Sequence, residues 1–244
     1  MALPLSSSDE IGTRQSLRAF RAGYWFGGFN GLTWMMGLGT PMVLLIEQLG
    51  GSTFQVGLAA SFVLLLFPVQ VLATAALATL GFRRQMVLAW SARALFLLVP
   101  LALAWLAPEE PAAWMPGAVV ASVFGFCAFR AMGVAAHIPW FAAILPDELR
   151  GRFFATDASI TSSVGVATLL CCAGLFAQLP TYRAFQAAYG IAVTGSVLAT
   201  MLAMTVGFSH VLLCGAACYL ISLFCVLSTP HAAVHGTGPG PDRT

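Results

Sequence analysis

Residues 115–152 decide the fold, and they read MPGAVVASVFGFCAFRAMGVAAHIPWFAAILPDELRGR. The stretch is almost wholly apolar until a short charged loop ends it, and Arg130 stands near its middle. A helix rises about 1.5 Å per residue, so this stretch can cross the roughly 30 Å hydrocarbon core of a bilayer. A guanidinium at the bilayer centre costs at least about 2.5 kcal/mol, so it normally faces a bundle interior or a polar cavity. The stretch therefore predicts a transmembrane helix with a polar site at mid-membrane.

Two ionisable side chains share one face of this predicted helix. Cys127, Arg130, Val134 and His137 recur at helical spacing, which places the arginine and the histidine on the same side. Arg130 is interpreted as a contact for an anionic substrate group or a participant in proton coupling. The alternative is a structural arginine that caps backbone carbonyls and bonds Gln70 or Asn30. Imidazole titrates near neutral pH, so His137 is a candidate for proton exchange; otherwise it only satisfies the turn kinked at residue 139.

Composition places the rest of the chain in the same class. Of the 244 residues, 59% are hydrophobic and 8% are charged, and the mean hydropathy is +0.87. Apolar runs of about twenty residues separated by short polar breaks are typical of polytopic helical membrane proteins, because a helix satisfies its own backbone polar groups in lipid. The predicted fold class is therefore an all-α membrane protein in a lipid bilayer. The net charge of +2 is too small to indicate a nucleic-acid partner.

Sequence motifs of catalysis are not found. The chain has no Gly-rich phosphate loop, no nucleophile elbow and no His-Glu-x-x-His spacing. Its six cysteines all fall inside apolar runs, where they read as small packing residues and not as a disulfide framework or a metal set. We therefore expect neither an enzyme nor a cofactor.

Apolar runs predict six membrane spans: residues 24–46, 56–80, 86–106, the opening stretch, 154–176 and 185–204. Residues 1–22 are interpreted as a leader with a basic amphipathic segment, and residues 23–206 as the six-helix domain. Residues 207–228 form a further apolar run that predicts a seventh helix. The Gly- and Pro-rich residues 229–244 predict a disordered tail.

The arginines give the predicted orientation. They precede the first span and lie between the second and third spans and between the fourth and fifth, whereas the alternate loops are mostly acidic. By the positive-inside rule the N-terminus is cytoplasmic, and we expect a multi-pass protein of the inner or plasma membrane. The arginines concerned are Arg14, Arg18, Arg21, Arg83, Arg84, Arg150 and Arg152.

Four more polar residues inside the spans are candidates for substrate binding or for an ion pair. Asn30 and Gln70 are uncharged amides and candidates for substrate binding, although bonding a neighbouring helix is the commoner role of such residues. Arg93 and Asp157 both lie within two or three turns of the predicted cytoplasmic end. They predict an ion pair that locks one conformation.

Two prolines predict an internal repeat. Pro41 in the first span and Pro139 in the fourth stand at nearly the same distance before the next element. Many secondary transporters consist of three helices followed by three more in inverted orientation, with kinked helices around a central site. The chain is therefore predicted to contain a 3+3 repeat.

The breaks between spans resemble those in the N-terminal half of major facilitator superfamily transporters. LGGSTFQVGL at 49–58 is similar to that family's join between helices one and two, and GFRR at 81–84 to the end of its signature loop. PDELRGR at 146–152 is similar to its join between helices four and five. The family's fourth-helix arginine pattern is approximated by Arg130 and Gly133, with the glycine one position closer. Ala78 stands where the signature loop has an acidic residue.

The resemblance implies a six-helix half bundle and secondary-active transport of a small polar or anionic organic solute. Because the family has two such halves, we expect a homodimer, a second-half partner or a larger membrane complex. The loops that resemble the family's imply a cytoplasmic gating region made of Gly81, Arg83, Arg84, Arg150 and Arg152.

A different class of function also fits. The scaffold can serve a non-transporting membrane subunit or assembly factor that holds another protein. The altered loop at Ala78 and the apolar run at 207–228 favour that alternative.

Overall fold

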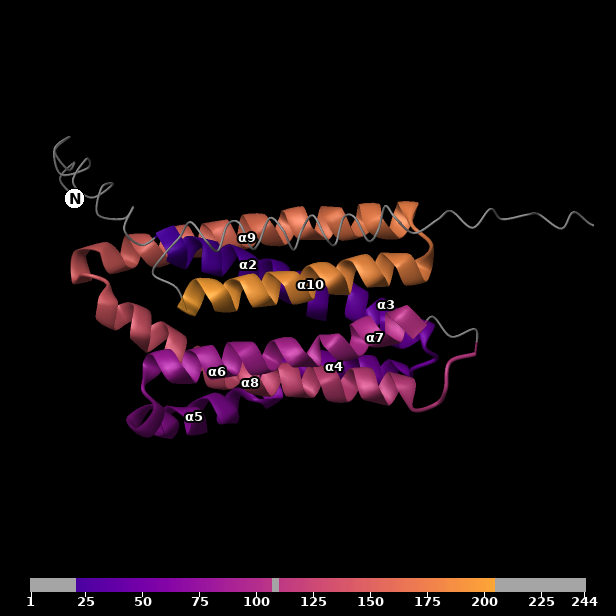
Figure 1. Cartoon of the computed structure of the whole chain (residues 1–244), viewed down its shortest axis with the longest axis horizontal. Helices are drawn as coiled ribbons and strands as arrows, with labels where there is room; N and C mark the ends of the chain where they lie inside the picture. Colours follow the sequence, from indigo (N-terminus) through magenta and orange to yellow (C-terminus); the bar gives the residue numbers. More distant parts are fainter. Residues whose placement is uncertain (1–20, 107–109, 205–244) are drawn as a thin grey trace, which may run out of the picture.

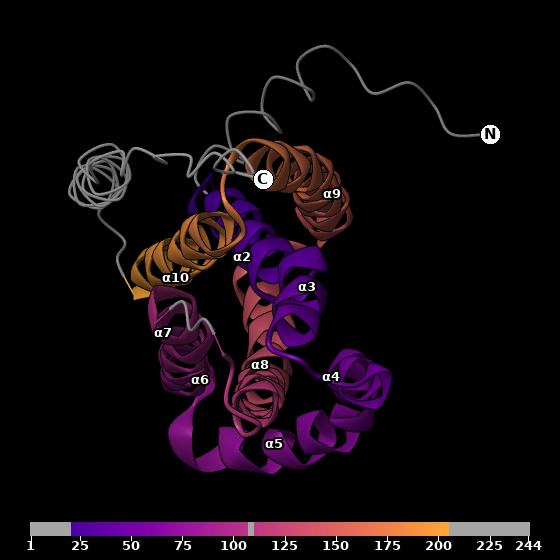
Figure 2. The same ribbon diagram turned by 90° about the vertical axis from the view of Figure 1, so that its right-hand side faces the viewer.

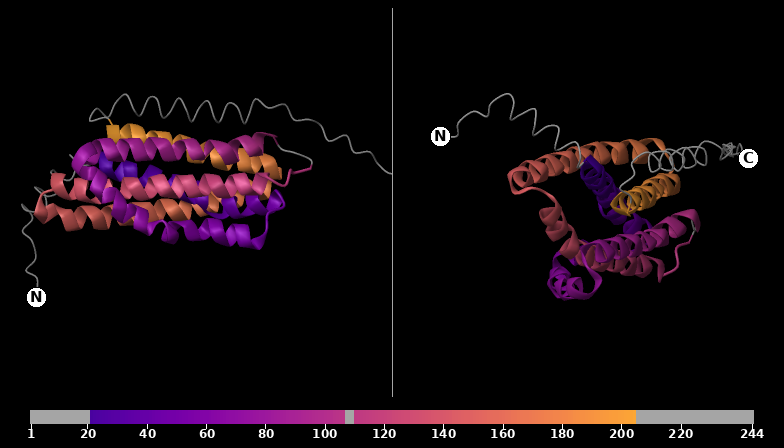
Figure 3. Two further views of the ribbon diagram at one scale, coloured as in Figure 1. Left: turned by 90° about the horizontal axis from the view of Figure 1, so that it is seen from below. Right: turned by 60° about the vertical axis from the view of Figure 1, so that its left-hand side comes forward.

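The computed structural model describes residues 21–106 and 110–204. Within these ranges the regular structure is entirely helical, and the helices run along one common direction (Figures 1 and 3). This confirms the predicted all-α fold class, and six helical segments in these ranges are long and apolar enough to cross a membrane, as a multi-pass membrane protein requires. The predicted seventh helix at 207–228, the tail at 229–244 and the leader up to residue 20 lie outside the described residues.

The first three spans each consist of two helices in series. These are α2 (Arg21–Leu38) and α3 (Thr40–Gln48), α4 (Thr53–Leu65) and α5 (Phe67–Leu80), and α6 (Phe82–Phe96) and α7 (Leu98–Leu106). Pro41, Pro68 and Pro100 stand in the first turns of α3, α5 and α7. Proline donates no ladder hydrogen bond and its ring clashes with the carbonyl four residues earlier, so each span is interrupted just before it.

The last three spans are single helices: α8 (Met115–Ile144), α9 (Asp147–Gln178) and α10 (Thr181–Met204). Pro139 lies inside α8 without ending it. Several spans begin earlier than predicted, including the second at Thr53 instead of residue 56 and the sixth at Thr181 instead of residue 185. The third span begins at Phe82 and not at residue 86, and the fifth begins at Asp147 and not at residue 154. Charged residues read as loop belong to the first helical turns, where Asp147 and Glu148 of α9 interact favourably with the positive end of the helix dipole.

Two connections between spans, the one before α4 and the one between α5 and α6, are tight for identifiable reasons. Gly81 makes the α5–α6 turn alone with a φ of 74°, a conformation that L side chains rarely adopt. Before α4, the Ser52 hydroxyl accepts from the Gln55 backbone N–H, and the Ser52 backbone N–H donates to the Gln55 side chain at 2.8 Å. This capping box fixes where α4 begins.

The helices α2 and α8 occupy the middle of the bundle (Figure 2). α2 packs against α9 and α10, whereas α8 packs against α4, α5 and α6. α10 also contacts α6 and α7, which joins the two groups of helices separated in Figure 1. Each central helix therefore finds its main neighbours in the other half of the chain.

Two spans are much less covered than the others. In their most apolar windows, 17% of the residues of α9 and 22% of those of the α4–α5 span are buried, against 56% in α8 and α10. Leu64, Leu72 and Leu170 are among the large side chains left exposed. α9 and α4–α5 thus present apolar faces to lipid or to another protein.

Candidate functional site

Arg130 lies inside the bundle on α8. Its side chain is partly buried, and its guanidinium carbon lies 4.5 Å from the centre of the Trp34 ring on α2. Within the described residues it makes no hydrogen bond and no salt bridge. The structural alternative, in which Arg130 caps carbonyls or bonds Asn30 or Gln70, has no such contact in this conformation.

A second arginine lies deeper. Arg93 of α6 is 1% exposed, and its guanidinium carbon lies over the rings of Trp90 and Phe126, at 4.7 and 5.1 Å from their centres. Its Nε and Nη2 atoms have no hydrogen-bond partner in the described part of the chain. Arg93 and Arg130 are neighbours, because the centres of the Phe126 and Trp34 rings on which they lie are 6.5 Å apart. The sequence had assigned Arg93 only to an ion pair.

Close packing of α6 on α8 brings these two arginines to one level. Gly133 lies against the indole of Trp90, and Gly125 lies against the ring of Phe96, so small residues of α8 receive large ones of α6. Each arginine stands between these two contacts on its own helix. The register of the α6–α8 interface therefore sets the position of both cations.

Asn30 of α2 lies at the same level. Phe26 contacts Trp90 with ring centres 5.6 Å apart, and Leu97 lies beside Gly37, so two contacts bracket Asn30 and fix α2 against α6. The Oδ1 atom of Asn30 is buried and has no partner among the described residues. Asn30 is thus a predicted site residue that lies level with the buried arginine.

A serine of α10 completes this level. The Thr33 hydroxyl donates to the carbonyl of Ala192 at 3.3 Å, and Ser196 follows one turn later on α10. Thr194 and Thr200 each donate to the carbonyl four residues earlier at 2.9 Å, but the buried Ser196 hydroxyl has no partner in the described ranges. We refer to four residues as the central polar layer: Asn30, Arg93, Arg130 and Ser196.

His137 lies two turns along α8 from Arg130, in a cage of rings. Its ring centre is 5.0 Å from that of Phe26, 5.9 Å from Trp90 and 4.8 Å from Phe141. Aromatic rings provide no strong proton acceptor. In this conformation His137 packs beside the central polar layer and does not belong to it.

Gln70 of α5 is partly buried and makes no hydrogen bond within the described residues. A different amide, Gln85, joins helices here, although the predicted third span begins only after it. It is 1% exposed, and its Nε2 donates to the carbonyls of Ala73 on α5 and Met132 on α8, both at 3.0 Å. The signal that could have found it is the glycine at 81, because a one-residue turn leaves Gln85 inside the next helix.

The predicted gating region forms two turns at the same end of the bundle. Arg83, Arg84 and Arg152 are exposed, and Gly81 makes its turn with positive φ. Arg150 differs, since it donates to the carbonyls of Ala142 and Leu145 at the end of α8 and forms a 2.6 Å salt bridge with Asp147. Arg150 therefore stabilises the α8–α9 turn.

Arg93 and Asp157 do not form a salt bridge in this conformation. Asp157 of α9 lies against Gly27 of α2, where an added Cβ would overlap its carboxylate. Arg93 faces α8 instead. The proposed pair remains a prediction for another conformation.

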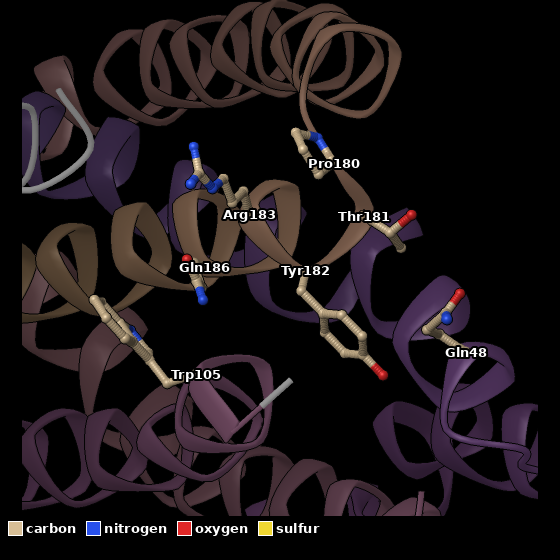
Figure 4. A pocket seen from close by; sticks show the side chains of 7 residues that line it. All are labelled: Gln48, Trp105, Pro180, Thr181, Tyr182, Arg183 and Gln186. Atoms are coloured by element: carbon tan, nitrogen blue, oxygen red, sulfur yellow. The ribbon is translucent and has the colours of Figure 1, made fainter. Parts of the chain in front are cut away.

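Two cavities lie away from the central polar layer. One, of about 500 Å³, lies between α3, α7 and α10 at the end opposite the gating region (Figure 4). It is lined by Arg183, Tyr182 and Gln186, and the Gln186 side chain donates to the carbonyl of Ala104 at 3.2 Å. The other is a groove of about 620 Å³ between α2 and α9 that begins at Arg21.

The described residues contain no group of three metal-ligating side chains that could hold an ion. The chain matches no protein-family model, and comparisons with curated proteins and with solved structures give no match. The geometry of the central polar layer is therefore the main indication of function.

Proposed function

We propose that the protein is a secondary transporter of the major facilitator type that moves a small anionic organic solute. The observation that carries the proposal is Arg130, a cation inside a membrane bundle with no hydrogen bond or salt bridge from the described residues. A charge taken out of water is costly unless it is paired. A solute with a negative group provides that pairing during part of a transport cycle.

The packing of the helices supports the 3+3 repeat. The first span of each triplet, α2 or α8, packs on the second and third spans of the other triplet, and the two third spans pack on each other. Exchanging the triplets therefore leaves the pattern of major contacts unchanged. Such symmetry is typical of transporters built from inverted repeats, whose sites lie near the bilayer midplane.

The exposed spans support a second half beside this one. α9 and α4–α5 are the least covered helices of the bundle. We propose that another copy of the chain covers them, with the N-terminus in the cytoplasm of a cell whose inner or plasma membrane holds the protein. Arg183 then lies at the outer mouth, where its charge attracts anions.

The test is uptake by the full chain reconstituted in lipid vesicles, with labelled mono- and dicarboxylates and phosphate esters. We expect uptake of at least one anion, with Arg130→Ala reducing it at least tenfold and Arg130→Lys reducing it less. Arg21→Ala removes an exposed arginine and serves as the matched control. Unchanged uptake in both Arg130 variants would contradict the proposal.

The alternative is a non-transporting membrane subunit, and the same uncovered apolar faces favour it. Mass determination in mild detergent separates the two. A homodimer that takes up anions supports the transporter. A stable complex with other membrane proteins, together with no uptake of any anion, supports the subunit.

A further inference from the structure

We propose that Arg93 and Arg130 together bind one oxyanion group, a carboxylate or a phosphate, with Arg93 as the inner ligand. This inference rests on the proposed function, because it names the substrate chemistry of the same site. Arg93 enters it as a binding residue and not as half of an ion pair.

The unpartnered atoms of Arg93 have the geometry for such a ligand. Nε and Nη2 donate from the same edge of the guanidinium plane, and both are buried without a partner among the described residues. Two parallel N–H groups match the two oxygens of a carboxylate or phosphate, which is how arginine binds these groups bidentately. The free edge is therefore a complete oxyanion fork.

The surroundings stabilise the charge of Arg93 without using that edge. Trp90 and Phe126 provide ring faces at 4.7 and 5.1 Å from the guanidinium carbon. A cation over a ring is stabilised, but a ring accepts no strong hydrogen bond from the N–H groups. Burial of donors without acceptors is unfavourable, so the site is incomplete as it stands.

Arg130 adds a second positive charge without a counter-charge. Arg130 lies over the Trp34 ring and Arg93 over the Phe126 ring, and the centres of these two rings are 6.5 Å apart, so the two cations are neighbours. No salt bridge in the described ranges neutralises either cation. A single bound anion relieves both unpaired charges. The Ser196 hydroxyl, buried and unpartnered at the same level, is a further donor for a third oxygen.

The exposure of the two arginines gives an order of binding. Arg130 is partly exposed, whereas Arg93 is 1% exposed. An entering anion therefore meets Arg130 first and reaches Arg93 when the bundle closes around it. Loss of Arg130 weakens capture, and loss of Arg93 weakens retention of the captured anion.

Thermal unfolding of the detergent-solubilised full chain tests the inference without transport. Succinate, inorganic phosphate and chloride are the probes. We expect succinate or phosphate to raise the Tm and chloride to raise it much less, because a halide offers a single acceptor atom where the two parallel N–H groups match two oxygens. An equal rise with chloride would overturn the oxyanion assignment.

Arg93→Met keeps an unbranched stem that reaches as far as the position of Nε, and it removes the guanidinium and its charge. We expect its Tm without anion to be at or above that of the wild type, since a buried unpaired charge is gone, and the anion-dependent rise to disappear. Arg93→Lys keeps the charge but not the fork, and we expect at least tenfold weaker binding. Arg21→Met is the control and should respond to anions as the wild type does.

A purely structural Arg93 predicts the reverse: a low Tm for Arg93→Met and an intact anion response in Arg93→Lys, which would overturn the inference. The proposed function fails separately. Anion binding that depends on Arg93 without uptake by vesicles supports the site and contradicts transport. Normal uptake and binding in Arg93→Lys supports transport and contradicts the site.

Discussion

Gly133 of α8 lies directly against the indole ring of Trp90 on α6. No Cβ fits at this position, because it would overlap the six-membered ring. The contact also brings Trp90 under the guanidinium of Arg93. One close approach between two helices therefore fixes both the register of the bundle and the environment of its deepest charge.

Gly133→Ala should destabilise the protein by about 1–3 kcal/mol, because the added methyl group overpacks a filled interface. Thermal unfolding in detergent measures the change. Gly117→Ala is the control on the same helix, since its Cβ would meet nothing within 4 Å. Equal effects of the two substitutions would show that the α6–α8 contact is looser than the structure has it.

Gly81→Ala should cost about 1–3 kcal/mol, because the turn requires φ of 74° and ψ of 158°, a region nearly restricted to glycine. Gly151→Ala, at an open helical position of α9, should be neutral or stabilising. Comparing the two Tm values tests the assignment of a one-residue turn. A tolerated alanine at 81 would argue for a longer loop.

Trp34→Leu removes the ring that lies on Arg130 and should weaken anion binding about fivefold, corresponding to roughly 1 kcal/mol of cation–π attraction. Trp34→Phe keeps a ring face and should retain part of the affinity. The succinate concentration at half-maximal uptake is the readout. Trp25→Leu, at an exposed position on the same helix, should leave it unchanged.

Gln85→Leu removes both hydrogen bonds that the side-chain amide donates to backbone carbonyls of α5 and α8. Each is worth about 0.5–1.5 kcal/mol, and loss of the unpartnered Oε1 offsets part of the cost, so we expect net destabilisation of about 1 kcal/mol. Thermal unfolding checks it, with the exposed Gln178→Leu as the control. A more stable Gln85→Leu variant would mean that the amide bridge contributes nothing.

Hydropathy predicted the six spans well, since each of these six runs is a helical segment long and apolar enough to cross a membrane. The predicted beginning of a span was wrong where a charged residue stands in the first turn of the helix, as at Arg83 and Asp147. Charge alone does not separate a helix end from a loop, because both contact water or headgroups.

The candidate site was predicted only in part. Arg130 was found because a charge in an apolar run is visible in the sequence. The position of Arg93 was not, because the Phe126 ring comes from another helix, and residue depth does not show which neighbour a side chain faces. Ser196 was invisible, since only the packed structure shows that its hydroxyl, unlike those of Thr194 and Thr200, lacks a carbonyl.

The interrupted spans of the first triplet give the bundle unequal stiffness. Where a backbone ladder is broken before Pro41, Pro68 and Pro100, bending takes little elastic energy, whereas α9 and α10 are uninterrupted and α8 is weakened only at Pro139. Three long helices are thus paired with three spans that each contain a hinge between two shorter helices. A rocking cycle in such a molecule would move α3, α5 and α7 on their pivots while the opposite triplet serves as the frame.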